Sequence, residues 1–137
     1  MLKAIVGLPG SGKSRLMTAQ KGYIILDDMG DDRTWGQCAW HKNKLLAKNC
    51  LDLAYNVIVS DVGFCRDEER AKLQSSFPDV QWVFFDNNKE ACIENVTRRN
   101  SEENRTHSLQ DELRTIEDLS AIYHPVNPSE RCFIHVG

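Results

Sequence analysis

The sequence lacks the cysteine and histidine patterns that mark disulfide-rich or metal-binding domains. Its 137 residues contain five cysteines, and no two of them form a C-x-x-C pair. An odd number without close spacing argues against a disulfide framework, so we expect free thiols and a reducing, cytoplasmic location. The four histidines are scattered and show no metal-ligand spacing.

Long apolar runs and strong net charge are also missing. No apolar run approaches the length of a membrane span, and the first residues form a strand pattern rather than a signal peptide. We therefore expect no membrane partner. The net charge of −3 argues against a broad nucleic-acid-binding face, although a local basic patch could still bind phosphate. The guanine-specific pattern Asn-Lys-x-Asp is absent, which argues against a GTPase.

A phosphate-binding pattern stands near the amino end. Residues 7–14 read Gly-Leu-Pro-Gly-Ser-Gly-Lys-Ser, and they lie between an apolar run at 2–6 and a helix-compatible run at 14–21. The glycines let the backbone turn tightly and point its N–H groups inward. The lysine supplies charge for the outer phosphates, and the last serine can ligate a nucleotide-bound Mg²⁺. The candidate nucleotide-binding residues are Gly10, Ser11, Gly12, Lys13 and Ser14, with Ser14 also a candidate metal ligand.

Apolar strands alternate with helices along the rest of the chain. We predict strands at 2–6, 23–26, 57–59, 80–85 and 132–136, with helices between them, one of which spans 34–55 with a break near 49–50. This alternation predicts one α/β domain over residues 1–137 with a parallel sheet and right-handed crossovers. Ligands on such sheets bind at the carboxyl ends of the strands. The phosphate loop should therefore share one edge with Asp27, Asp28, Asp61 and Asp86.

Together these motifs resemble the small P-loop kinases, and most of all the polynucleotide 5′-hydroxyl kinases and zeta-toxin-like proteins. The resemblance rests on the phosphate loop, Leu-Asp-Asp at 26–28, Val-Ser-Asp at 59–61, Phe-Asp at 85–86 and paired arginines at 98–99, and it runs over nearly the whole chain. It implies a three-layer P-loop NTPase fold with a five-stranded parallel sheet in the order 2-3-1-4-5. It also implies transfer of the γ-phosphoryl group of ATP, with Mg²⁺, to a hydroxyl group. The acceptor would be a polynucleotide 5′-end, a modified DNA base or a nucleoside, or else another small molecule.

The resemblance gives roles to the carboxylates at the strand ends. Asp27 matches the general base that takes the proton of the acceptor hydroxyl. Asp28 points to the opposite side, because neighbours in a strand alternate, and it either meets the acceptor or caps the loop. Asp61 matches the second acidic motif, which holds magnesium through water or contacts the acceptor. The alternative for Asp61 is a cap on the helix that begins near Arg66.

A polar segment at about 99–108 resembles the lid of these kinases. Arg99 and Arg105 would stabilise charge on the transferring phosphate, because guanidinium is planar and always charged. Arg98 would contact the nucleotide or merely complement a helix dipole. In related kinases an arginine often stands one turn earlier, where this chain has Asn95. That departure keeps open a rival interpretation, an NTP-binding switch or an ATPase.

The acceptor side departs from the family pattern as well. Gly30 stands where polynucleotide kinases carry an arginine for the acceptor phosphate, and Arg33 is the candidate to replace it. Trp35 either stacks on a ring of the acceptor or belongs to the core. Tyr123 either shapes the pocket of the nucleotide base or packs in the core.

Overall fold

The computed structural model describes residues 1–102, 108–125 and 130–132. Its parallel sheet is built on β2 (Tyr23–Leu26), β3 (Asn56–Ser60), β1 (Leu2–Val6) and β4 (Gln81–Phe85), in that spatial order. This is the order predicted for the first four strands. A three-residue strand, β5 (Glu130–Cys132), pairs in parallel with β4 at the edge of the sheet. The last strand therefore begins two residues earlier than predicted, and residues 133–136 lie outside the described part.

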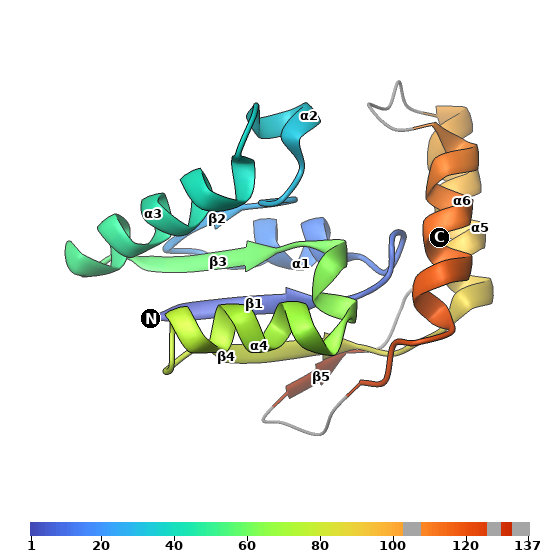
Figure 1. Cartoon of the computed structure of the whole chain (residues 1–137). Coiled ribbons are helices and arrows are strands. Elements are labelled where there is room, and N and C mark those ends of the chain that lie inside the picture. Colours follow the sequence, from blue (N-terminus) through green and yellow to red (C-terminus); the bar gives the residue numbers. More distant parts are fainter. Residues whose placement is uncertain (103–107, 126–129, 133–137) are drawn as a thin grey trace.

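Helices cover both faces of the sheet (Figure 1). Helices α3 (Ala39–Asp52) and α4 (Asp67–Ser76) lie on one face and α1 (Lys13–Ala19) lies on the other. Strand alternation explains the division, because Ala4 and Val6 belong to the core cluster under α3 and α4, whereas Ile5 packs with Met17 of α1. The result is the three-layer arrangement expected from the sequence.

The segment predicted as one helix at 34–55 is divided in two, and the break is not where it was expected. Helix α2 (Asp32–Trp35) ends at Gly36, whose φ is +85°, and α3 starts after Cys38, whose φ is +60°. Two residues with positive φ so close together interrupt a right-handed helix. The predicted break near residues 49–50 is therefore wrong, since α3 passes through both residues.

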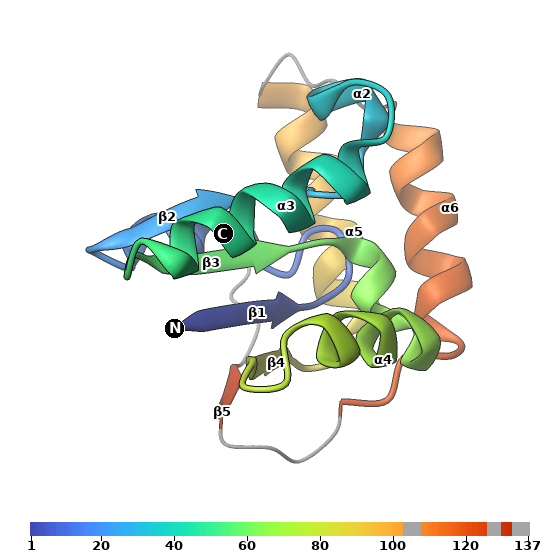
Figure 2. The ribbon, with the colours of Figure 1, turned by 60° about the vertical axis from the view of Figure 1, so that its left-hand side comes forward.

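Two helices pair beyond the carboxyl ends of the strands. Helices α5 (Lys89–Glu102) and α6 (Leu109–Ser120) stand side by side there, next to the phosphate loop and the short 3₁₀ helix η1 (Val62–Cys65) (Figure 2). Helix α5 continues to Glu102, beyond its predicted end at Arg98 and Arg99, so its last residues overlap the segment predicted as a lid at about 99–108. The rest of the predicted lid, residues 103–107 with Arg105, lies outside the described residues. Within the described part of the chain, no helix is long and apolar enough to cross a membrane.

The structure describes the side chains of four of the five cysteines. Cys38, Cys50, Cys65 and Cys92 are free thiols, in agreement with the prediction for these positions. Burial raises the pKa of both Cys65 and Cys92 to about 11, so these two thiols are protonated near neutral pH. Neither is therefore suited to act as a nucleophile.

Candidate active site

The phosphate loop leads from β1 directly into α1, and its lysine is held inside it. The Lys13 ammonium donates to the carbonyl oxygens of Gly7 and Leu8, each at 2.9 Å, and the residue is buried. An ammonium has three N–H donors, so these bonds leave one for an outer phosphate. Ser11 is also buried, and its N–H donates to the Leu8 carbonyl within the turn.

Helix α5 supports the loop from the side. The Asn95 amide, which is buried, donates to the carbonyl of Gly10 at 2.9 Å. A Cβ atom on Gly10 would lie 2.5 Å from the Cys92 carbonyl oxygen of α5, and the φ of Gly10 is +84°. Both the conformation and the close approach therefore require glycine. The residue that stands in place of the family's arginine is thus an anchor for the loop.

Gly10→Ala should destabilise the protein more than Gly22→Ala, and it should also weaken ATP binding. The two glycines have nearly the same φ, +84° and +83°, but a Cβ on Gly22 would meet nothing within 4 Å. Gly22→Ala therefore measures the left-handed strain alone, about 1–2 kcal/mol. Gly10→Ala adds the clash with α5, which should cost at least about 1 kcal/mol more. Urea denaturation of both variants gives the difference in the free energy of unfolding. Equal losses of stability would mean that α5 shifts to accommodate the Cβ atom at no cost in free energy.

Asp27, just after β2, lies between two hydroxyl groups. Ser14, the second residue of α1, donates to its Oδ2, and Ser60, the last residue of β3, donates to its Oδ1. The indole N–H of Trp35 donates to the Asp27 carbonyl at 2.8 Å, which holds the backbone at this position. The carboxylate therefore stands directly beside the residue that ends the phosphate-binding pattern.

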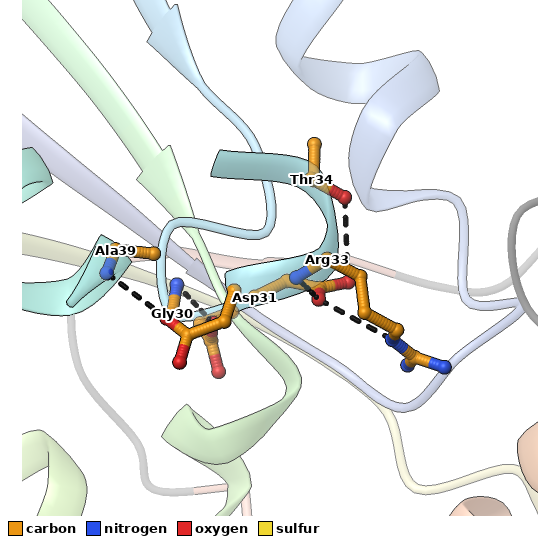
Figure 3. Close-up of polar contacts among 7 residues, drawn as sticks. Gly30, Asp31, Arg33, Thr34 and Ala39 are labelled. Carbon is orange, nitrogen blue, oxygen red and sulfur yellow. Dashed lines mark hydrogen bonds and ion pairs between the residues drawn. The ribbon is translucent and has the colours of Figure 1, made fainter. Parts of the chain in front are cut away.

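The loop after Asp27 is built on carboxylate caps (Figure 3). Asp31 accepts the N–H of Arg33 at 2.9 Å and so caps α2, and the Arg33 Nε lies 3.5 Å from the same oxygen. Asp32 accepts the N–H of Ala39 at 3.0 Å and ties α2 to α3. Asp28 begins this loop in a left-handed conformation with a φ of +51°. Local geometry thus accounts for several of the aspartates that follow β2.

Asp61 joins this loop to the end of β3. Its two carboxylate oxygens accept the N–H groups of Gly30 at 2.7 Å and of Gly63 at 2.8 Å. Burial raises the pKa of Asp61, and the two backbone bonds oppose this rise. Asp61 therefore caps the 3₁₀ helix η1 and not the helix near Arg66, since α4 starts at Asp67 with Arg66 as its N-cap. Its side chain also borders the cleft described below.

The arginines of α5 face carboxylates. Arg99 Nη2 lies 3.9 Å from Glu112 Oε2, a buried carboxylate of α6, and Arg98 Nη1 lies 3.7 Å from Glu102 one turn along its own helix. The first pair joins the two helices, and the second is an exposed pair that contributes little to stability. Both arginines are thereby oriented along the wall of the same cleft.

A cleft of about 790 Å³ lies between the strand ends and the pair α5 and α6. Its walls include most of the predicted site residues: Gly10, Gly12, Lys13, Ser14, Asp27, Asp28, Arg33, Asp61, Arg98 and Arg99. Ser11, Trp35 and Tyr123 do not line it. Tyr123 is only 1% exposed and its hydroxyl donates to the Phe85 carbonyl, which assigns it to the core, the second of the two alternatives.

The contacts that three residues make at this site were not predicted from the sequence. Ser60 stands beside Asp61 in the Ser-Asp motif, so its place at a strand end was a usable signal. Asn95 was noted only as a departure from a family pattern. Glu112 had no signal at all, because its partner Arg99 lies on another helix.

Comparison with known proteins defines the class of fold. No protein-family model matches this chain, and no curated protein matches it in sequence. A gluconokinase from Sinorhizobium meliloti 1021 is similar in structure, with a TM-score of 0.61 and 18% identity over 96% of this chain and 81% of that chain. A shikimate kinase from Acinetobacter baumannii, in complex with shikimate, aligns over 99% of this chain and 84% of that chain, with a TM-score of 0.48 and 16% identity.

The likeness to the gluconokinase shows that this chain shares its fold, an α/β domain with a parallel sheet. At this level of identity it shows the fold alone. It gives no specific support to the finer resemblance to polynucleotide kinases and zeta-toxin-like proteins.

Proposed function

We propose that this protein is a kinase that transfers the γ-phosphoryl group of ATP to a hydroxyl group. The position of Asp27 carries the proposal, because its carboxylate accepts a hydrogen bond from Ser14 at the end of the phosphate loop. A carboxylate there lies next to the outer phosphates of a nucleotide bound by the loop. Phosphoryl transfer depends mainly on such positioning and on charge stabilisation.

In this proposal each side of the cleft has its own task. Lys13 and the loop N–H groups hold the phosphates of ATP. Asp27 orients the acceptor hydroxyl and takes its proton. As it does so, the acceptor oxygen bonds to the γ-phosphorus, and ADP leaves with the electron pair of the broken bond. Arg99, oriented by Glu112, stabilises charge on the moving group, and Arg98 contacts the nucleotide. A role for Arg105 stays a prediction from the sequence.

The residues around Ser14 fit a nucleotide-bound Mg²⁺. A hydroxyl and a carboxylate are the oxygen donors that Mg²⁺ prefers, and this metal is usually bound by one or two protein oxygens together with substrate phosphates. Ser14 would ligate the metal, which would neutralise phosphate charge. Both oxygens of Asp61 already accept backbone N–H groups, so we assign it contact with the metal only through water.

The charge of the cleft favours a small-molecule acceptor over a polynucleotide. Among the described residues, its walls carry eight carboxylates and five cationic side chains. A polynucleotide brings a row of phosphates and is usually met by several unshared lysines and arginines. Arg33, the candidate for an acceptor phosphate, lies beside Asp31. Trp35 gives its N–H to the Asp27 carbonyl, so we assign it to holding that loop rather than to stacking.

Incubation with γ-labelled ATP, Mg²⁺ and a panel of acceptors tests the proposal. The panel contains sugars, sugar acids, nucleosides, oligonucleotides with a free 5′-hydroxyl and DNA with hydroxymethylated bases. We expect label in a small-molecule acceptor. Label in an oligonucleotide would support the kinase activity but identify a polynucleotide as the acceptor. Free phosphate with no labelled acceptor would show that the protein is an ATPase and not a kinase. Nucleotide binding with neither product would show that it is an NTP-binding switch.

A further inference from the structure

Ser60 lies inside the sheet, next to the candidate active site. It ends β3, the strand between β1 and β2, where it pairs with Ile5 of β1. The register on the other side pairs Leu26 with Val59, so Asp27 comes next to Ser60. Ser60 has 0% exposure, so it cannot touch a nucleotide or an acceptor. Any effect that it has on the site must act through its neighbours.

Two hydrogen bonds of Ser60 lead to the segment that begins with Asp27. Its hydroxyl donates to Asp27 Oδ1, and its carbonyl accepts the N–H of Met29 at 3.1 Å. Hydrogen bonds from a hydroxyl to a carboxylate are among the stronger ones, because the acceptor is charged. The side chain of Asp27 and the backbone of Met29 are therefore both bonded to the last residue of β3.

The second carboxylate oxygen of Asp27 accepts the Ser14 hydroxyl. Ser14 belongs to α1 and Ser60 to β3, so one carboxylate joins the end of the phosphate loop to β3. A carboxylate bonded on one oxygen only could rotate about its side-chain torsions. With a hydroxyl on each oxygen, its orientation toward Ser14 is set from the buried side.

We propose that Ser60 is a positioning residue, which holds the Asp27 carboxylate against the Ser14 hydroxyl and thereby strengthens the Mg²⁺-dependent part of nucleotide binding. The inference rests on the proposed function, since it takes residues 7–14 to bind a magnesium nucleotide. Groups that orient metal ligands typically change metal affinity by about 10–100-fold when removed. A merely structural serine would instead affect the stability of the fold and leave the response to the metal unchanged.

The test compares ATP affinity with Mg²⁺ and with EDTA, measured by calorimetry on the full chain. Addition of Mg²⁺ should raise the affinity of the unsubstituted protein, and in Ser60→Ala this gain should fall by about 10-fold. The affinity in EDTA should change less than about 2-fold, because Ser60 does not touch the phosphate loop's N–H groups or Lys13. This measurement needs no acceptor and no turnover.

Cys65→Ala is a matched control. It also removes one heavy atom from a side chain with 0% exposure, five residues along the chain. Since burial raises the pKa of Cys65 to about 11, the substitution changes no charge at neutral pH. It should leave the Mg²⁺-dependent gain as it is in the unsubstituted protein. If Ser60→Ala does not fold, Ser60→Cys keeps the number of heavy atoms and replaces a strong donor by a weak one, and its gain should fall as well.

A double-mutant cycle identifies the path of the effect. If Ser60 acts through Asp27, then Ser60→Ala should cost nothing further in a chain that already carries Asp27→Ala. Additive losses, or an equal loss with Mg²⁺ and with EDTA, or an unchanged gain in Ser60→Ala, would each overturn the inference. None of these three results would contradict the proposed kinase activity, as long as the unsubstituted protein labels an acceptor. Failure of the unsubstituted protein to bind ATP would remove both proposals.

Discussion

Lys13→Ala should reduce phosphoryl transfer at least about 100-fold and should weaken ATP binding. The Lys13 ammonium is held by two loop carbonyls at 2.9 Å, so it points into the loop without a nucleotide having to order it. Its remaining N–H would meet the outer phosphates in a partly buried site, where a charge is screened less than in water. Labelled ATP gives the rate, and calorimetry gives the affinity.

Loss of Lys13 also frees two loop carbonyls, so its structural effect has to be separated from its effect on ATP. Thermal denaturation without nucleotide measures the first, and the shift in melting temperature on addition of ATP measures the second. Lys21→Ala is a suitable control, because Lys21 is an exposed lysine just beyond the end of α1. If Lys13→Ala binds and turns over ATP as the unsubstituted protein does, residues 7–14 are not a nucleotide site.

Asp27→Asn should lower the rate of label transfer by about 10²–10⁴-fold, the range typical of a lost general base. The amide keeps the shape of the side chain and can still accept the Ser60 hydroxyl, but it cannot take a proton from the acceptor. Because the carboxylate lies beside Ser14, binding of Mg²⁺ with ATP should weaken too. Rates at saturating ATP and Mg²⁺ separate the chemical loss from the binding loss.

Asp28→Asn is the matched comparison for Asp27→Asn. Asn tolerates the left-handed conformation that Asp28 adopts, so the backbone is not strained by the change. Transfer should stay within about 10-fold of the unsubstituted rate, since the Ser14 hydroxyl donates to the neighbouring carboxylate of Asp27. A large loss in Asp28→Asn together with normal transfer in Asp27→Asn would exchange the roles of the two residues and remove the observation on which the kinase proposal rests.

Much of the fold could be predicted from short stretches of sequence. The strands at 2–6, 23–26 and 57–59 are apolar runs bounded by turn residues, and β1, β2 and β3 include them. The helix at 34–55 was less predictable. Its break depends on the positive φ angles of Gly36 and Cys38, and hydrophobic periodicity contains no information on those angles. The end of α5 was placed too early, because the charged and polar residues 98–102 suit an exposed helical turn as well as a loop.

The sequence by itself determined the phosphate loop, the parallel direction of the strands and the gathering of aspartates at one edge of the sheet. Each follows from residues that are neighbours in the chain or from the handedness of strand–helix–strand connections. Only the tertiary structure decided which carboxylate meets Ser14, that Asn95 holds the loop and that Tyr123 is buried. Those contacts join residues 13 to 85 positions apart, and their geometry depends on how the layers pack.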